Sequence, residues 1–172
     1  DAVGLLAFGD AVHELRTPTT RQLQVGALYH ALEGLTPSGS GTTELAFQTF
    51  AQRIRRHTLF VLISDFHEPA DELRDRIASL GSAGHEVLLV QVLDAAEREP
   101  SLRNVAVLED AETGDVLPVS RSGVTEYAGR LAAHIKAVQD AARGLGAHHV
   151  CVYTDEPLDR TLADYLRFRS RA

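Results

Sequence analysis

The chain has 172 residues, of which 44% are hydrophobic, so it holds enough apolar material for one domain with a sizeable core. Its 17 basic and 24 acidic residues give a net charge of 17 − 24 = −7, which argues against nucleic acid as a partner. The longest apolar runs have the length of a strand, so we expect no membrane insertion by these residues. The single cysteine, Cys151, lies in an apolar run and cannot form an internal disulfide.

The start of the chain is unusual. The sequence contains no methionine and begins at Asp1, in the middle of an apolar pattern. We therefore expect these residues to be part of a longer protein whose own N-terminus lies upstream. Any part of a functional site that upstream residues contribute would then be absent from the chain.

The first third of the chain predicts a hairpin followed by two helices. Apolar residues 3–8 and 12–15 flank a turn at Gly9–Ala11, which is the pattern of two antiparallel strands. A helix is predicted after Thr20 and should end at Gly34. The second helix has an apolar face made of Phe47, Phe50, Ala51 and Ile54.

Strands and helices alternate in the rest of the chain. Residues 59–64 form an apolar run without a charge, which predicts a strand buried on both faces of a parallel sheet. Further strands are predicted at 86–93 and 150–153, and a second hairpin between Asn104 and Val119. The intervening helices have apolar stripes at Leu73, Ile77 and Leu80, at Val124, Tyr127, Leu131, Ile135, Val138, Ala142 and Leu145, and at Leu158, Leu162, Tyr165 and Leu166. This alternation predicts a three-layer α/β domain with a mainly parallel, doubly wound sheet and an antiparallel edge hairpin.

A functional site is expected where the parallel strands end, because ligands bind at that edge of open α/β sheets. Asp65 follows the strand 59–64, next to Ser64, and the hydroxyl-rich loop before Thr43 could reach the same rim. Hydroxyl groups with one carboxylate suit a hard divalent cation such as Mg²⁺. Each of these residues has a structural interpretation as well: Asp65 can be a turn or capping residue, and Thr42 and Thr43 can cap the second helix.

The sequence offers no catalytic motif. The dinucleotide and phosphate-loop patterns, the nucleophile elbow and zinc-type histidine spacing are all missing. Asp94 reads as a strand terminator, and Asp155 reads as the N-cap of the last helix. We therefore expect that the protein is not an enzyme. The alternative is a Mg²⁺-dependent, phosphatase-like hydrolase that uses Asp65, with Asp94 and Asp155 as further acidic residues.

Three segments in this order, residues 3–8, 35–45 and 61–66, resemble a von Willebrand factor A domain. They are most similar to the bacterial family called domain of unknown function fifty-eight. Similar stretches continue through Gly84–Val87, Glu112–Gly114 and Thr154–Leu158, so the resemblance covers nearly the whole chain. It implies a Rossmann-like sheet of von Willebrand A type.

The resemblance implies a metal-ion-dependent adhesion site made of three loops. Thr43, with Thr42 as the other candidate, matches the threonine loop, and Asp65, with Ser64 beside it, matches the aspartate loop. The remaining loop needs an Asp-x-Ser-x-Ser motif, which occurs nowhere in the chain, so we expect it upstream of Asp1. These residues should therefore hold a partial site. Mg²⁺ or Mn²⁺ would bind to the intact protein, and at most weakly to this chain by itself.

The resemblance also implies a non-enzymatic protein-interaction module. Members of this family are often encoded beside MoxR-type AAA+ ATPases, so the implied role is that of an adaptor for such an ATPase. A cytoplasmic location is expected, or a membrane tether through a segment upstream of Asp1. In the family's topology, the upstream strand would lie between the strands predicted at 3–8 and 59–64.

Overall fold

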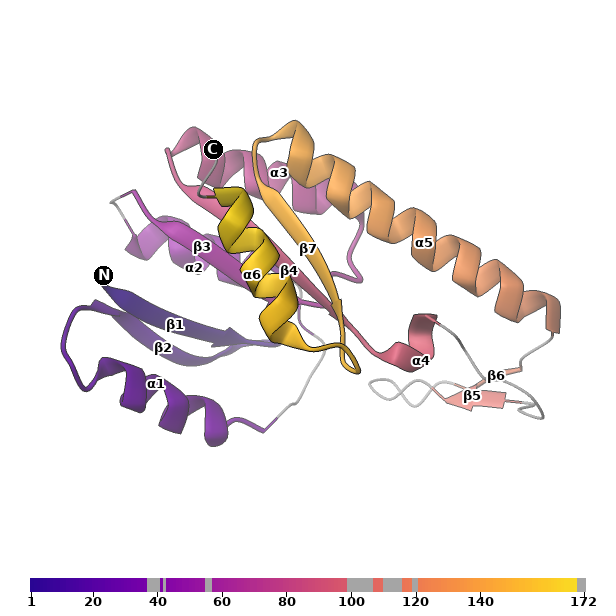
Figure 1. Cartoon of the computed structure of the whole chain (residues 1–172), viewed down its shortest axis with the longest axis horizontal. Coiled ribbons are helices and arrows are strands. Elements are labelled where there is room, and N and C mark those ends of the chain that lie inside the picture. The colour runs from indigo at the N-terminus through magenta and orange to yellow at the C-terminus, as the bar shows by residue number, and fades with distance from the viewer. Residues whose placement is uncertain are drawn as a thin grey trace. The chain divides into compact units, whose positions relative to one another are not determined.

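The computed structural model of the chain describes residues 1–36, 41, 43–54, 57–98, 107–109, 116–118 and 121–169. The chain divides into two compact units, which are described separately below (Figure 1). Asp1–Arg55 form the N-terminal unit, and Arg56–Ala172 form the C-terminal unit.

The N-terminal unit contains the predicted hairpin and both predicted helices. Strands β1 (Val3–Phe8) and β2 (Val12–Thr19) pair in an antiparallel manner, and helices α1 (Gln24–Glu33) and α2 (Thr43–Arg53) follow. Helix α1 contacts both strands, and α2 contacts β1. As predicted, Gly34 caps the end of α1. Strand β2 is longer than predicted because it continues through Pro18 to Thr19.

Proline in β2 changes the register of the hairpin. Val3 lies opposite Thr19 and Leu5 lies opposite Arg16, so the pairing shifts between these positions. Pro18 has no N–H to donate, which favours a bulge at this point of the ladder. A Cβ atom on Gly4 would lie 2.6 Å from the carbonyl oxygen of Arg16 and 2.9 Å from the nitrogen of Pro18. The close approach of the two backbones therefore requires glycine at position 4.

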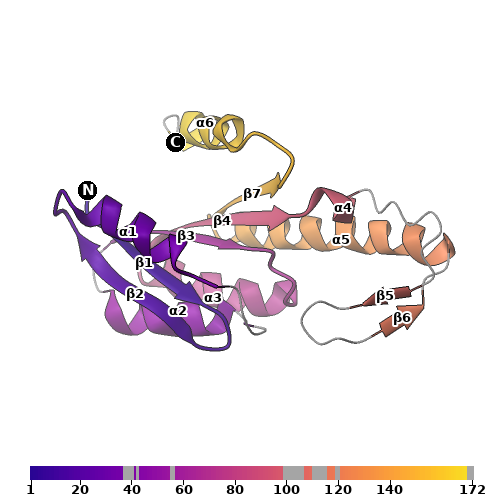
Figure 2. The same ribbon diagram turned by 90° about the horizontal axis from the view of Figure 1, so that it is seen from below.

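The C-terminal unit is built on a parallel sheet with strand order β3-β4-β7. These strands span Leu59–Ser64, Glu86–Leu93 and His148–Tyr153. Helices α3 (Ala70–Ser82) and α5 (Arg121–Gly144) pack together on one face, and α6 (Leu158–Arg169) covers β7 on the other (Figures 1 and 2). The three layers and the parallel sheet confirm the predicted α/β class.

Two small elements connect β4 to α5. Helix α4 (Ala95–Arg98) follows β4 directly, and strands β5 (Val107–Glu109) and β6 (Val116–Pro118) form the second hairpin. Residues 104–106, 110–115 and 119, which belong to the predicted hairpin segment, lie outside the described residues. None of the described helices is both long and apolar enough to span a membrane.

The core of the C-terminal unit is centred on β4. This strand lies between two others and has helices on both sides of its sheet, so Leu88 and Leu89 are both buried. The predicted stripe of α3, made of Leu73, Ile77 and Leu80, is buried as well. In α5, the best-buried positions are Val138 and Ala142, whereas Ile135 is only half-buried.

Strand β3 differs from its prediction. Phe60 and Leu62 are buried, but Val61 and Ile63 are 46% and 65% exposed, so the described residues of the C-terminal unit leave one face of the strand uncovered. The reason is its position: β3 is at the edge of its sheet, and α6 contacts β7 at the opposite edge. Within the described part of the chain, β3 pairs with β4 alone.

Candidate functional site at the carboxyl edge of the parallel sheet

The three parallel strands end at the same edge of the C-terminal unit. Asp65 follows β3, Asp94 follows β4 and Thr154 follows β7. Because parallel strands present their carboxyl ends together, these three polar residues share one rim. Asp65 is the predicted ligand position and Asp94 the predicted strand terminator, whereas the sequence did not single out Thr154.

Asp65 presents its carboxylate to solvent. Its side chain is 55% exposed. The hydroxyl of Ser64 donates a hydrogen bond to Asp65 Oδ1 at 3.3 Å and accepts one from the Phe66 N–H at 3.2 Å. The two adjacent oxygen-bearing side chains are therefore oriented toward each other at the end of β3.

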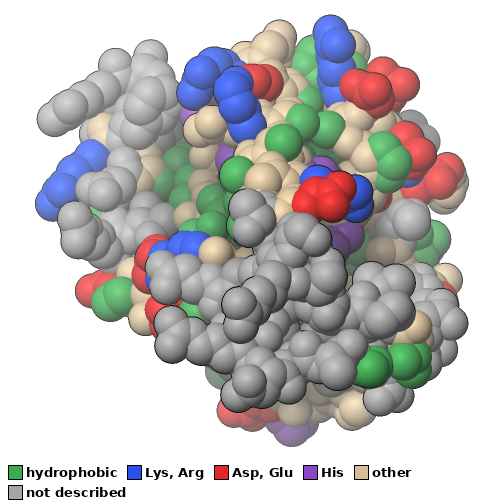
Figure 3. Space-filling view, turned by 90° about the vertical axis from the view of Figure 1, so that its right-hand side faces the viewer, with side chains coloured by type: hydrophobic (Ala, Val, Ile, Leu, Met, Phe, Trp, Pro, Cys, Tyr) green, Lys and Arg blue, Asp and Glu red, His purple; other side chains and the backbone are tan. Residues whose placement is uncertain are grey.

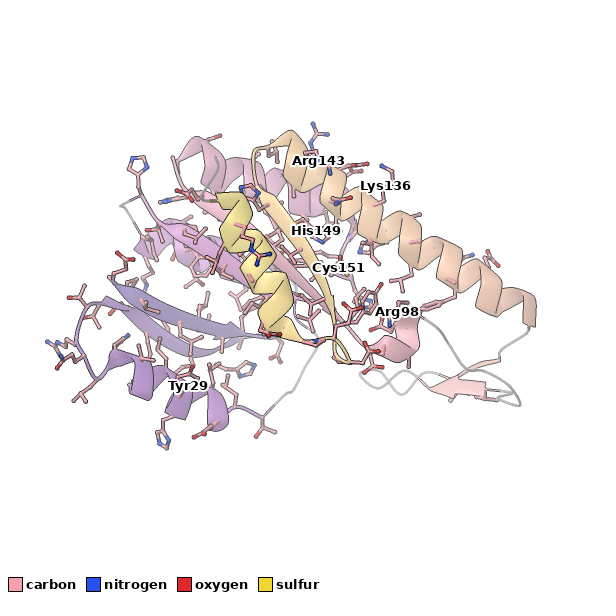
Figure 4. All side chains as sticks on the ribbon, in the orientation of Figure 1. Tyr29, Arg98, Lys136, Arg143, His149 and Cys151 are labelled. Carbon is pink, nitrogen blue, oxygen red and sulfur yellow. The ribbon has the colours of Figure 1, made fainter. Side chains whose placement is uncertain are left out.

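A buried polar pair, Gln91 and His149, holds the backbone of Asp65 in position. Gln91 is 0% exposed, and its Nε2 donates a hydrogen bond to the Asp65 carbonyl at 2.8 Å. His149, which is labelled on β7 in Figure 4, donates from Nε2 to Gln91 Oε1 at 3.0 Å. Burial lowers the pKa of His149, so the ring stays neutral at neutral pH. The buried amide is thus satisfied at both ends, and it fixes the position of Asp65.

Phe66 turns the chain sharply after Asp65. Its φ of 52° lies in the left-handed region, which costs a non-glycine residue about 1–2 kcal/mol. The ring is 1% exposed, and the carbonyl accepts a hydrogen bond from His134 Nε2 at 2.6 Å. Burial of the ring and this hydrogen bond offset the backbone strain, so the strand end has one fixed conformation.

Glu97 on α4 connects neighbouring groups at the rim. Its Oε2 lies 3.8 Å from His67 Nε2 and accepts a hydrogen bond from the Tyr127 hydroxyl at 3.3 Å. Burial and the charge of Glu97 raise the pKa of Tyr127. His67 Nε2 also lies 3.6 Å from Asp65 Oδ2, so this exposed histidine lies between two carboxylates.

Asp94 has a structural role. Its Oδ1 accepts from the Ala96 N–H at 2.8 Å, and Glu97 Oε1 accepts from the Asp94 N–H at 2.9 Å. These reciprocal bonds form a capping box at the start of α4. Asp94 Oδ2 accepts from the Thr154 hydroxyl at 3.2 Å. Both carboxylate oxygens of Asp94 are therefore engaged.

Asp155 is not at the first turn of α6, which begins at Leu158. Its Oδ2 lies 3.3 Å from Arg98 Nη2, and Arg98 Nη1 donates to Glu156 Oε1 at 2.7 Å. The guanidinium of Arg98 also lies 4.4 Å from the centre of the Tyr153 ring, beside the end of β7 (Figure 4). Asp155 thus belongs to an exposed ion-pair cluster rather than to the predicted helix cap.

The predicted ligand residues fall in different parts of the chain. Ser64 and Asp65 are together at the rim of the C-terminal unit, whereas Thr43 is a buried residue at the start of α2 in the N-terminal unit. Thr42 lies outside the described residues. Because the two units are described separately, the pairing of Thr43 with Asp65 stays a prediction.

The sequence did not single out His67, Glu97 or Tyr127 as site residues. One signal was available, because Asp94 and Glu97 have the spacing of a capping box. Nothing local to the sequence could indicate that Tyr127, 30 residues further along, donates to Glu97.

The chemistry of the rim suits a partial cation site. Ser64 and Asp65 offer hydroxyl and carboxylate oxygens, which are the donors that Mg²⁺ prefers. In the described part of the chain, no group of three His, Cys, Asp or Glu side chains could hold a metal ion. Figure 3 views one face of the molecule, and the coloured acidic, basic and histidine side chains on it are interspersed rather than gathered in one patch.

Comparison with known proteins identifies the fold. BatB, a conserved hypothetical protein from Bacteroides thetaiotaomicron, matches with a TM-score of 0.60 and 12% identity, over 100% of this chain and 80% of that one. An aerotolerance-related membrane protein from Bacteroides fragilis matches with a TM-score of 0.56 and 16% identity, over 88% and 72% of the two chains. At these identities the likeness shows the fold alone, which is the α/β fold of von Willebrand A type.

The chain belongs to the family described as protein of unknown function DUF58, whose sequence model matches residues 1–137. Uncharacterized proteins Mb1516 of Mycobacterium bovis and Rv1480 of Mycobacterium tuberculosis are each 35% identical to it over 169 residues. The match covers 95% of this chain and 51% of each relative, so the chain spans about half the length of these curated relatives. Uncharacterized protein MAV169 of Mycobacterium avium is 34% identical over 74% of both chains.

Proposed function

We propose that this chain is a non-enzymatic protein-interaction module that acts as an adaptor for a MoxR-type AAA+ ATPase. The observation that supports the proposal best is the environment of Asp65. Its carboxylate is exposed, whereas its backbone is held by Gln91 and followed by the fixed turn at Phe66. An exposed carboxylate on a fixed backbone is suited to recognition, because little conformational entropy is lost on binding.

In this proposal a divalent cation connects the module to its partner. Asp65 and Ser64 would contribute oxygen ligands, together with Thr43 and residues of an upstream loop. Mg²⁺ or Mn²⁺ would supply a Lewis-acidic position that a carboxylate of the partner protein completes. The surrounding surface must then add buried area, because a single contact of this kind is weak.

The engagement of the other carboxylates favours recognition over hydrolysis. A metal-dependent hydrolase needs further acidic ligands and a general base near Asp65. Asp94 caps α4 with one oxygen and accepts from Thr154 with the other, and Asp155 pairs with Arg98. Both residues are therefore engaged with other groups, which supports recognition as the proposed role of Asp65.

We further propose that the module works in the cytoplasm, with a membrane tether contributed by another segment of the protein. The Bacteroides fragilis structure is called that of a membrane protein, which is compatible with such a tether. Fractionation of cells that express the full-length protein would test this location.

The adaptor proposal is tested by measuring binding between the full-length protein and the MoxR-type ATPase of the same genome, with Mg²⁺ and with EDTA. We expect binding that requires the metal and that Asp65→Ala removes. Asp71→Ala is the matched control, since Asp71 is an exposed carboxylate in the first turn of α3. Binding that is insensitive both to EDTA and to Asp65→Ala would refute the role of this site.

Calorimetry with Mg²⁺ alone separates metal binding from partner binding. We expect weak binding to this chain and tighter binding to a version extended upstream, with Asp65→Ala abolishing the latter. A tight site in this chain by itself would show that the upstream loop is not needed. Hydrolysis of a simple phosphate ester that depends on Asp65 would favour the hydrolase alternative instead.

A further inference from the structure

We propose that a hollow in the N-terminal unit binds a phosphate group through three arginine side chains. The hollow is open to solvent and has a volume of about 530 Å³. Arg16, Arg21 and Arg53 line it, together with Thr17, Thr19 and Gln24. The site lies wholly within Asp1–Arg55 and does not involve Asp65, so it is independent of the adaptor proposal.

The three arginines come from three different elements. Arg16 is in β2, Arg21 is in the loop that follows this strand, and Arg53 is the last residue of α2. Residues separated by 37 positions in sequence, from Arg16 to Arg53, thus converge on one hollow. Convergence of this kind depends on the fold of the unit, because no local pattern brings the three side chains together.

The backbone around the hollow is fixed by hydrogen bonds. Gln24 Nε2 donates to the Val3 carbonyl at 3.1 Å and to the Thr17 carbonyl at 3.5 Å. These bonds tie the first residue of α1 to both strands of the hairpin. Thr19 Oγ1 also accepts from the Arg21 N–H at 3.4 Å, which holds the loop against the end of β2. The walls of the site are therefore formed before a ligand arrives.

Charge points to the class of ligand. Arg16 Nε lies 2.9 Å from Glu14 Oε1, whereas Arg21 and Arg53 form no ion pair with any described residue. Three guanidinium groups and one carboxylate sum to 3 − 1 = +2, in a chain whose net charge is −7. A phosphate monoester carries about −1.5 to −2 at neutral pH and would balance this charge, whereas a carboxylate would balance half of it.

Geometry favours phosphate as well. Guanidinium groups bind phosphate through two parallel N–H···O bonds, which arginine forms and lysine does not. Thr17 and Thr19 line the same hollow, and their hydroxyl groups are a type of donor that phosphate oxygens accept. The phosphate could belong to a small soluble compound or to a lipid headgroup, and the two sources are separated experimentally.

The test is a titration of the full chain with inorganic phosphate and pyrophosphate at low ionic strength, followed by calorimetry. We expect saturable binding that Arg21→Gln and Arg53→Gln each weaken about tenfold or more, which corresponds to about 1.4 kcal/mol of binding free energy. Arg53→Lys keeps the charge but loses the two-point geometry, so its affinity should lie between those of the parent and Arg53→Gln. The matched control is Arg74→Gln, which removes an equal charge from an exposed position on α3 in the other unit.

The second experiment measures sedimentation of the protein with vesicles of phosphatidylcholine, with and without phosphatidic acid. Sedimentation with phosphatidic acid that the same two glutamine variants abolish would assign the phosphate to a lipid headgroup. Binding of soluble phosphate without vesicle binding would assign it to a small compound. The proposal is wrong if folded protein binds neither ligand, or if Arg74→Gln weakens binding as much as the pocket variants do.

Discussion

Gln91 in β4 donates a side-chain hydrogen bond to the backbone carbonyl of Asp65 at 2.8 Å, across the boundary between two neighbouring strands. A wholly buried glutamine in an otherwise apolar strand would be costly if it were unpaired. Here Gln91 accepts a hydrogen bond from His149 and donates one to Asp65. A residue that would weaken the core if it were unpaired therefore holds the end of β3 in position.

We predict that Gln91→Leu lowers the free energy of unfolding by about 1–3 kcal/mol, because it leaves the Asp65 carbonyl and the His149 N–H without their partner. Urea denaturation measures the change. Gln52→Leu is the control, since Gln52 is exposed on α2 and should change stability little. Equal effects of the two substitutions would mean that the buried hydrogen bonds contribute nothing measurable.

The depressed pKa of His149 predicts a dependence of stability on pH. Burial lowers this pKa in the folded state below the unfolded value of 6.5, so below that value the unfolded chain binds more protons than the folded one. The contribution of His149 is therefore complete above pH 6.5 and is lost as the pH falls toward the folded pKa. Thermal denaturation of the parent and of His149→Gln, compared between neutral and mildly acidic pH, isolates this contribution. A larger loss at acidic pH in the variant than in the parent would contradict the expected sign.

Helix α5 offers a test of its buried face. Val138→Ala should cost about 2–3 kcal/mol, because it removes two buried methyl groups at about 0.8 kcal/mol each and leaves a cavity. Ile135→Ala should cost less than a fully buried isoleucine would, since Ile135 is half-buried. Lys136→Ala should cost little, because Lys136 is exposed and its ion pair with Asp140 is screened by solvent. Chemical denaturation measures the three variants, and a loss for Lys136→Ala as large as that for Val138→Ala would mean that another face of the helix is buried.

Two glycines of the N-terminal unit should respond in opposite directions to alanine. Gly4→Ala should destabilise the protein, because the new Cβ would lie 2.6 Å from a backbone oxygen that cannot move aside cheaply. Gly26→Ala should stabilise it by about 0.5–1 kcal/mol, because Gly26 is in α1 and a Cβ there would meet nothing within 4 Å. Melting temperatures of the two variants check the signs. Stabilisation by both substitutions would show that the hairpin tolerates a wider separation of its strands.

The sequence predicts most of the fold because the signals for its elements are local. The apolar stripe of α3 and the glycine at the end of α1 both depend on neighbours a few residues apart, and the structure confirms both. Val61 and Ile63 show where such reasoning stops. Their run looks like a central strand, but the exposure of a strand depends on which elements cover it, and no residue within the run encodes that.

The candidate site likewise contains some features that the sequence predicts and others that it does not. Asp65 could be predicted because it follows an apolar run directly, and the capping box of Asp94 and Glu97 was readable from its spacing. The approach of His67 to Glu97 and the support of Asp65 by Gln91 could not be predicted, because these contacts join different strands and helices. The pairing of Thr43 with Asp65 stays a prediction that the metal titration tests.

Within the described part of the C-terminal unit, the unpaired edge of β3 has a consequence for handling the protein. An apolar edge strand is a template to which another strand can add, and natural proteins usually protect such edges with charges or proline. Between Leu59 and Ser64 there is neither a charge nor a proline, and Val61 and Ile63 face outward. Two copies could join through this edge in an antiparallel manner, since a twofold contact needs only one self-complementary surface. Concentrated preparations of this chain should therefore tend to aggregate. Ile63→Lys should reduce this aggregation, because it places a charge on the exposed face of the strand.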